Sequence, residues 1–220
     1  LVHNDQLMWT TLSMGLFMVG YCTTVGFAVY YMKYIFGDES MYVVLVGVCG
    51  VAQLSALSVY PAVAKRFNRK QLYTLSTVLV LAGYGIFFFA EISIILIALG
   101  AVLVFVGQAF IQTLMLMFLA DTVEYGTYKT GTRAAGISFS LQTFVAKLKN
   151  GLIGSVILLS LSAVGFVEGE GAVQPAGVAD GVWALFCLLP AAGFAIALAI
   201  LILGYKLRTP DVQVMARFNN

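Results

Sequence analysis

The chain has 220 residues, of which 61% are hydrophobic and 10% are charged, and its formal net charge is +2 at pH 7. Roughly a quarter of the residues of a soluble domain are charged, so this composition excludes a soluble domain and indicates a protein that crosses a membrane several times. The small net charge gives no electrostatic footprint for nucleic acid. Cys22, Cys49 and Cys187 all lie in apolar stretches, without the spacing of a disulfide framework or a zinc site.

Six apolar stretches are each long enough to cross a hydrocarbon core about 30 Å thick. In chain order they cover about residues 6–33, 41–64, 71–90, 92–120, 135–164 and 182–205. All six are predicted to be helices, because a lone strand cannot satisfy its backbone hydrogen bonds in lipid. We therefore expect an all-α membrane protein with a single transmembrane domain over residues 1–220. The first residue is Leu rather than Met, so we also expect the natural N-terminus to lie upstream.

Basic residues are distributed unevenly between the two sides of this predicted topology. Nine lysines and arginines fall on one side, and Lys33 stands alone on the other. The nine are Lys65, Arg66, Arg69, Lys70, Lys129, Arg133, Lys206, Arg208 and Arg217. Because cytoplasmic loops are enriched in basic residues, this side and both termini are predicted to be cytoplasmic, in a multi-pass protein of the cell membrane. The other loops are predicted to face outward; their acidic residues include Asp38, Glu39, Glu168 and Glu170.

The fourth span carries amides and runs into a charged segment. Gln108 and Gln112 are four residues apart and share one helix face. The span is predicted to end at Asp121. The segment that follows contains Glu124, Tyr125, Gly126, Tyr128, Lys129, Gly131 and Arg133.

Two interpretations of this charged segment stay open. It is either a solvated loop whose exposed ion pairs contribute little, or a gate. In the gate, Asp121 and Glu124 pair with cations on other helices in one conformation and separate in another. Gly126, Gly131 and Gly136 are expected to let the backbone bend tightly.

The fifth span contains two lysines, Lys147 and Lys149. Lys147 lies twelve residues beyond Ala135, and at 1.5 Å per residue this places it about 18 Å into the membrane, near the middle. That depth favours a position facing an aqueous cavity over snorkelling to the surface. One polar face, bordered by Gln142, is formed by Ser140, Thr143, Lys147, Asn150 or Gly151, and Gly154. Lys149 lies about 200° round the helix from Lys147, so it cannot share this face, and the sequence offers it no partner.

Motifs of enzymes and of ATP-driven pumps are missing from the sequence. It contains no phosphate-binding loop, nucleophile triad or metal-ligand cluster, and its single histidine, His3, lies outside the spans. We therefore do not expect an enzyme. Hydroxyls, amides and a lysine at mid-membrane suit the binding of a small polyhydroxylated or anionic solute.

Residues 120–147, ADTVEYGTYKTGTRAAGISFSLQTFVAK, resemble the glycoside–pentoside–hexuronide:cation symporters of the major facilitator superfamily. The family pattern is Ala-Asp, an acid three residues later, Tyr-Gly, a Tyr, a downstream Arg, then Ser-x-Gln-Thr and a Lys. It falls here on Ala120-Asp121, Glu124, Tyr125-Gly126, Tyr128, Arg133, Ser140, Gln142-Thr143 and Lys147. The six-span layout and the basic second loop, residues 65–70, extend the resemblance over the whole chain.

The resemblance implies a carrier of twelve helices in two bundles, with sugar bound between them. This chain corresponds to the C-terminal bundle, which in that superfamily is an inverted pair of three-helix repeats. The sugar-lining positions of the family fall on Gln112, Gln142, Thr143, Ala146 and Lys147. Its cytoplasmic gate falls on Asp121, Glu124, Tyr128 and Arg133.

The resemblance also implies partners. They are a sugar or glycoside, membrane lipid, and an N-terminal half or a second copy of the chain, without nucleic acid. No cofactor is expected, because the family binds its coupling cation, H⁺ or Na⁺, in the N-terminal bundle. Two residues depart from the family pattern: Lys149 replaces a small residue, and Gln112 replaces an aromatic found in some members.

The expected function is therefore sugar:cation symport by alternating access, with this chain supplying the C-terminal half. Two alternatives stay open. One is a stand-alone six-helix protein that dimerises into a pore or another kind of carrier. The other is a truncated, non-transporting sensor or scaffold.

Overall fold

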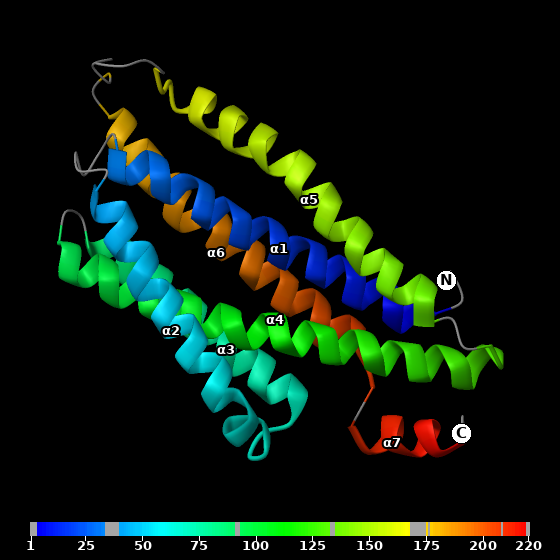
Figure 1. The fold of residues 1–220 in the computed structure, drawn as a ribbon. Coiled ribbons are helices and arrows are strands. Elements are labelled where there is room, and N and C mark those ends of the chain that lie inside the picture. Colours follow the sequence, from blue (N-terminus) through cyan, green and yellow to red (C-terminus); the bar gives the residue numbers. More distant parts are fainter. Residues whose placement is uncertain are drawn as a thin grey trace.

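The computed structural model describes residues 4–33, 40–90, 93–132, 135–167, 175, 177–207 and 209–218. Within these ranges the regular structure is entirely helical (Figure 1). The helices are α1 (Asp5–Tyr31), α2 (Ser40–Ala64), α3 (Arg69–Ala90), α4 (Ile94–Thr130), α5 (Ala135–Ala163), α6 (Val178–Gly204) and α7 (Thr209–Phe218). Helices α1 to α6 are long and apolar enough to cross a membrane, which confirms the predicted all-α, six-span class.

The fourth span differs most from its prediction. α4 has 37 residues and continues past Asp121 to Thr130, so the segment 121–130 is neither a loop nor a bend. Asp121 ends the apolar run without ending the helix, because its carboxylate is buried against partners from other helices. The expectation of a bend at Gly126 is wrong. The helix ends at Gly131, whose φ of 70° is a left-handed conformation that glycine adopts without strain.

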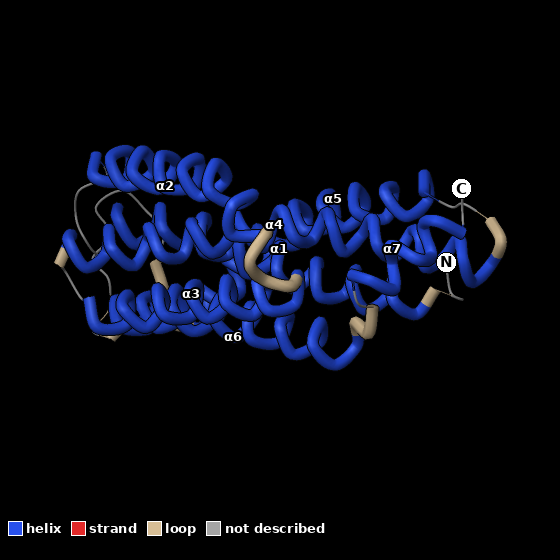
Figure 2. Tube along the Cα trace, turned by 90° about the horizontal axis from the view of Figure 1, so that it is seen from below, coloured by secondary structure: helices blue, strands red, loops and turns tan. Residues whose placement is uncertain are grey.

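The six long helices form three layers. Figure 2 shows α2 and α5 along one side, α3 and α6 along the opposite side, and α1 and α4 between them. α4 packs against α2 and α3, and α1 packs in the same way against α5 and α6. Contacts between α1 and α4 and between α3 and α6 join these two groups of three helices. Each helix thus has a counterpart three places later, which is the arrangement of two three-helix repeats of opposite orientation.

Glycines let α3 and α4 approach closely along their shared interface. A Cβ added to Gly107 of α4 would lie 2.7 Å from the carbonyl oxygen of Ser76, and one added to Gly83 of α3 would lie 2.8 Å from that of Gly100. Small residues at such crossings let two backbones come into contact in lipid, where no hydrophobic effect drives helices together. The pair therefore forms a tightly packed centre of the bundle.

Buried hydroxyls join α1 to α3 at two levels. Ser13 lies 3.4 Å from the Tyr73 hydroxyl and donates a 2.7 Å bond to the Ala197 carbonyl of α6. One level further on, Thr24 is hydrogen-bonded to the Tyr84 hydroxyl. These bonds fix the register of α1 against α3 and α6.

Little of α2 and α5 is buried. On α5, the buried side chains are Ser138, Val145, Ile157 and Leu161. Large apolar side chains such as Val43 and Leu54 on α2, and Phe144 and Leu159 on α5, are more than half exposed. This layer of the bundle is consequently available to lipid or to another protein surface.

The short helix α7 was not among the predicted elements. It packs against the projecting end of α4, where the Phe218 and Tyr128 rings lie 6.3 Å apart between centroids. Val212 is buried in this contact region, while Val214 stays half exposed. α7 and the start of α1 lie at the same end of the bundle (Figure 1).

Candidate gate and solute-binding cavity

A buried carboxylate, that of Asp121, joins three helices at the end of the bundle where α4 projects. Asp121 is 5% exposed, and its Oδ2 forms an ion pair with the Arg69 guanidinium at the start of α3. The same oxygen accepts a 2.8 Å hydrogen bond from the hydroxyl of Tyr205, the residue that follows α6. One charge on α4 thus holds together this helix, the start of α3 and the end of α6.

Local sequence positions both partners of Asp121. Arg69 is the first residue of α3, where the Gln71 side chain accepts a 3.2 Å bond from the Asn68 backbone N–H, as in a capping box. Tyr205 caps the C-terminus of α6, with its backbone N–H donating to the Leu201 carbonyl. Each of these two helix ends therefore has a local hydrogen bond of its own in addition to the contact with the carboxylate.

Tyr205 is held as a hydrogen-bond donor. Burial, followed by the nearby Asp121 carboxylate, raises the pKa of its phenol above the usual value. Its ring packs on Phe118, with centroids 4.7 Å apart, and the Lys70 ammonium lies 5.5 Å from the ring centroid. The phenol consequently keeps its proton, and its bond to Asp121, at physiological pH.

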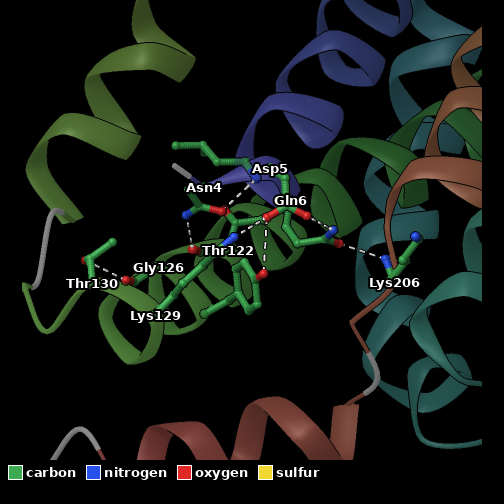
Figure 3. A network of polar contacts seen from close by, with 10 residues as sticks. Asn4, Asp5, Gln6, Thr122, Gly126, Lys129, Thr130 and Lys206 are labelled. Carbon is green, nitrogen blue, oxygen red and sulfur yellow. Dashed lines mark hydrogen bonds and ion pairs between the residues drawn. The ribbon is translucent and has the colours of Figure 1, made fainter. Parts of the chain in front are cut away.

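A second polar network ties the start of α1 to the projecting end of α4 (Figure 3). The Asp5 carboxylate accepts a 2.9 Å bond from the Lys129 ammonium and a 3.1 Å bond from the Tyr125 hydroxyl. Asn4 donates to the Thr122 carbonyl at 2.8 Å and caps α1 by accepting from the Leu7 N–H at 3.0 Å. Asp5 and Lys129 are both about half exposed, so their ion pair contributes far less than the buried bonds of Asn4.

The predicted gate residues have different environments. Asp121 is buried, Glu124 is half-buried, and Tyr128 is exposed beside Phe218 of α7. Arg133 lies outside the described residues. The interpretation of residues 121–130 as a solvated loop is wrong, whereas the gate stays a prediction.

A cavity of about 280 Å³ lies between α1, α4 and α5. It is lined by Met14, Phe17, Met18, Tyr21, Gln112, Met115, Leu116, Gln142 and Lys149. The structure therefore brings two predicted sugar-binding amides, Gln112 and Gln142, to one hollow. These amides can donate to and accept from hydroxyl groups.

Lys149 belongs to this cavity rather than to a packed helix interface. Its ammonium lies 6.0 Å from the centroid of the Tyr21 ring. Such a cation–π contact is worth about 0.5–2 kcal/mol, less than the ~2.5–3.5 kcal/mol that a lysine costs at mid-membrane by insertion scales. Within the described part of the chain, Lys149 forms neither an ion pair nor a hydrogen bond.

The other predicted binding residues lie outside this cavity. Thr143 and Lys147 are exposed on α5, and the Thr143 hydroxyl donates only to the Phe139 carbonyl of its own helix, at 3.3 Å. Ala146 is half-buried and does not line the cavity. The polar face of α5 thus lies on the surface of this bundle, separate from the hollow that holds Gln142.

Tyr21 also borders a second cavity, of about 240 Å³, on the α2 side of α1. Thr24, Tyr42 and Gln53 supply its polar lining, among mostly apolar side chains. Gln108, by contrast, is fully buried, and its amide has no hydrogen-bond partner among the described residues. Gln53 therefore lines a cavity, whereas Gln108 lies in the bundle interior and lines neither of these two cavities.

Sequence reasoning did not identify Arg69, Tyr205 or Asp5 as partners in the polar networks. Arg69 is one of four basic residues in the segment 65–70, and nothing in the segment distinguishes it from the others. Its position at the first turn of α3, after the Asn68 and Gln71 capping pair, is the signal that could have identified it.

A family model described as "MFS/sugar transport protein" matches residues 1–209. The chain is 32% identical over 167 residues to a lactose permease of Lactobacillus delbrueckii subsp. bulgaricus, covering 76% of this chain and 27% of the permease. It is 30% identical over 203 residues to an isoprimeverose transporter of Lactiplantibacillus pentosus, covering 91% of this chain and 42% of the transporter. A glucuronide carrier protein homolog of Escherichia coli is 30% identical over 182 residues, covering 82% of this chain and 39% of the homolog.

The chain spans less than half the length of these curated relatives. The family match nevertheless covers all six membrane-spanning helices and the segment that carries the Ala120–Lys147 pattern. The chain belongs to the MFS/sugar transport protein family, as a multi-pass membrane protein of the glycoside–pentoside–hexuronide symporter group in the major facilitator superfamily.

Proposed function

We propose that this chain forms the C-terminal half of a sugar:cation symporter that works by alternating access, and that it is a transporter rather than an enzyme. The observation that carries the proposal is the exposure of Thr143 and Lys147 on the polar face of α5, where the rise per residue places them about 12–18 Å into the membrane. Lipid does not suit an exposed ammonium at that depth. A second six-helix bundle, with a wet cavity between the two, supplies the environment that this face needs.

The proposed solute is a sugar or glycoside. Relatives named for lactose, raffinose, isoprimeverose and glucuronide transport support this class. Gln112 and Gln142 bind sugar hydroxyls within the α1–α4–α5 cavity, whereas Thr143 and Lys147 contact the solute at a separate place, on the polar face of α5 between the two bundles. Ala146, which is half-buried on the same helix, is the fifth proposed binding position. The coupling cation, H⁺ or Na⁺, binds in the partner bundle.

The gate is proposed to lie at the end of the bundle where Asp121 is buried. The Asp121–Arg69–Tyr205 contacts hold α4, the start of α3 and the end of α6 together as one unit. When the bundles rock, this unit moves as a whole, while Glu124, Tyr128 and Arg133 make and break contacts with the partner bundle. The concentration of basic residues supports a cytoplasmic position for this end and for both termini.

The test is uptake of radiolabelled sugars by the full-length carrier in membrane vesicles with imposed H⁺ or Na⁺ gradients. We expect at least one glycoside to accumulate above equilibrium with one gradient and not without it. Uptake that reaches equilibrium at the same level with either gradient or none would contradict symport. Binding of no sugar at all would contradict the proposed substrate class.

A second candidate is a carrier made from two copies of this chain. The location of α2 and α5 in one exposed layer favours it, because a two-fold copy would cover both helices (Figure 2). Light scattering of the purified 220-residue chain in detergent distinguishes the two: a monodisperse dimer that binds sugar supports the second candidate, and a monomer supports the first.

A further inference from the structure

Lys149 is a cation in a cavity whose described lining contains no acid. Among the nine residues that line the α1–α4–α5 cavity there is no Asp or Glu, and Lys149 is the only charged one. The other polar groups are the Gln112 and Gln142 amides and the Tyr21 phenol, which are all neutral. The cavity therefore has a net positive charge, balanced within the described residues only by the face of an aromatic ring.

We infer that Lys149 makes this cavity a binding site for the acidic group, a carboxylate or a sulfonate, of a sugar substrate. The inference rests on the proposed function of sugar transport and specifies the substrate class. In a low-dielectric site, an ammonium attracts an anion far more strongly than it does in water. A hydrogen bond between two charged groups is also about twice as strong as one between neutral groups.

The lining of the cavity fits a sugar acid of modest size. Its volume of about 280 Å³ is near the lower end for small-molecule sites, so it accepts one sugar ring rather than a long oligosaccharide. Gln112 on α4 and Gln142 on α5 can hydrogen-bond the ring hydroxyls while Lys149 holds the acid. Met14, Met18 and Met115 supply a soft apolar wall that adapts to the ring faces.

The two lysines of α5 have separate tasks under this inference. Lys149 faces the cavity with Tyr21, whereas Lys147 is exposed on the other side of the helix. Lys149 therefore discriminates acid from neutral sugars in the cavity, whereas Lys147, which lies outside the cavity, does not distinguish them. This difference provides a matched comparison within two residues of sequence.

The experiment measures binding to the full-length carrier in detergent, using pairs of methyl glycosides that differ only at C6. The probes are methyl glucoside against methyl glucuronide, methyl galactoside against methyl galacturonide, and methyl glucoside against its 6-deoxy-6-sulfo analogue. The variants are Lys149→Met, which keeps the length and removes the charge, Lys149→Arg, which keeps the charge, and Lys147→Met. Thermal unfolding of each variant reports whether it is folded.

We expect the unaltered carrier to bind at least one acidic glycoside about tenfold more tightly than its neutral partner, as a charged hydrogen bond provides. Lys149→Met abolishes this preference by weakening the binding of the acidic member of a pair, and Lys149→Arg retains it. Lys147→Met, which changes a lysine outside the cavity, keeps the preference for the acidic member of a pair. Whether the carboxylate or the sulfonate gives the larger preference identifies the acid.

Other results overturn the inference. A carrier that binds neutral glycosides as well as or better than acidic ones contradicts the role of Lys149 and leaves sugar transport standing. A preference for acids that survives Lys149→Met assigns the recognition to another residue. If Lys149→Met is unfolded and Lys149→Arg loses the preference, the lysine is structural. Binding of no glycoside in the panel, acidic or neutral, overturns sugar transport together with the inference.

Discussion

Lys147 and Lys149 are separated by a single residue and occupy different environments. Lys147 is exposed on α5, while Lys149 points into a cavity toward Tyr21. Helix geometry alone predicts that the two lysines diverge, because they lie about 200° apart round the axis. Their surroundings could not be predicted, since Tyr21 and Gln112 reach the cavity from helices distant in the sequence.

The buried Asp121 carboxylate carries the first prediction. Replacing it by Asn leaves the Arg69 guanidinium without its counter-charge, while the bond from Tyr205 can persist. We expect Asp121→Asn to destabilise the full-length carrier by about 1–3 kcal/mol, less than for a fully buried pair because Arg69 is one-third exposed. Thermal unfolding of Asp121→Asn, Arg69→Gln and the double variant measures this loss of stability and the coupling energy between the two residues.

The control for the Asp121 and Arg69 variants is Lys129→Gln, which breaks the exposed ion pair between Lys129 and Asp5. Its effect should be clearly smaller than that of Asp121→Asn. The double variant should lose less stability than the sum of the single changes, because the two partners share one interaction. Additive losses of stability, or equal losses for Asp121→Asn and Lys129→Gln, would contradict a stabilising ion pair between Asp121 and Arg69.

At the scale of helices, the apolar runs predicted five of the six spans closely, because crossing a membrane demands a continuous run of apolar residues. The length of α4 was not predictable in this way. Its continuation depends on Arg69 and Tyr205, which neutralise and bury Asp121 from other helices. α7 was missed because it has only ten residues and mixes polar with apolar side chains, so it lacks the signal of a span.

The close packing of α3 on α4 carries the second prediction. Gly107→Ala places a Cβ 2.7 Å from the Ser76 carbonyl oxygen, and backbone on both sides prevents local relief. We expect a loss of about 1–3 kcal/mol from this overpacking, measured by thermal unfolding. Gly85→Ala on the open side of α3 is the matched control, and it should be neutral or stabilising because Ala favours helix. Tolerance of both changes would disprove the close approach.

The length of α4 carries the third prediction. At 1.5 Å per residue, 37 residues span about 55 Å, so the helix projects beyond a core of about 30 Å. Cysteines introduced at Ser93 and Thr130, which are both exposed, should be labelled by a membrane-impermeant maleimide from opposite sides. Thr130→Cys should react from the cytoplasmic side, as the basic residues predict.

The unaltered chain is the control for this labelling, because Cys49 and Cys187 are buried and Cys22 is half-buried. Labelling of both new cysteines from one side would show that α4 does not span the membrane as described. Labelling of Thr130→Cys only from outside would reverse the proposed orientation without altering the fold.

At the scale of the whole molecule, the bundle has a packed side and an open side. α1, α3, α4 and α6 share the deeply buried core, whereas α2 and α5 form a layer with few buried side chains. The sequence indicated six spans and one polar face, but it could not show that this face lies outside the bundle. That placement follows from tertiary packing, because α5 presents Val145 and Lys149 to the neighbouring helices and leaves Thr143 uncovered.

The most direct test of the half-carrier proposal is the reactivity of Thr143→Cys in the full-length carrier. If a second bundle and a wet sugar cavity cover this face, a water-soluble maleimide should label the cysteine, and a transported sugar should slow the labelling. Leu148→Cys, also exposed but about 140° round α5, should face lipid and stay unreactive. A Thr143→Cys as unreactive as Leu148→Cys, or labelling that no transported sugar slows, would contradict the proposal.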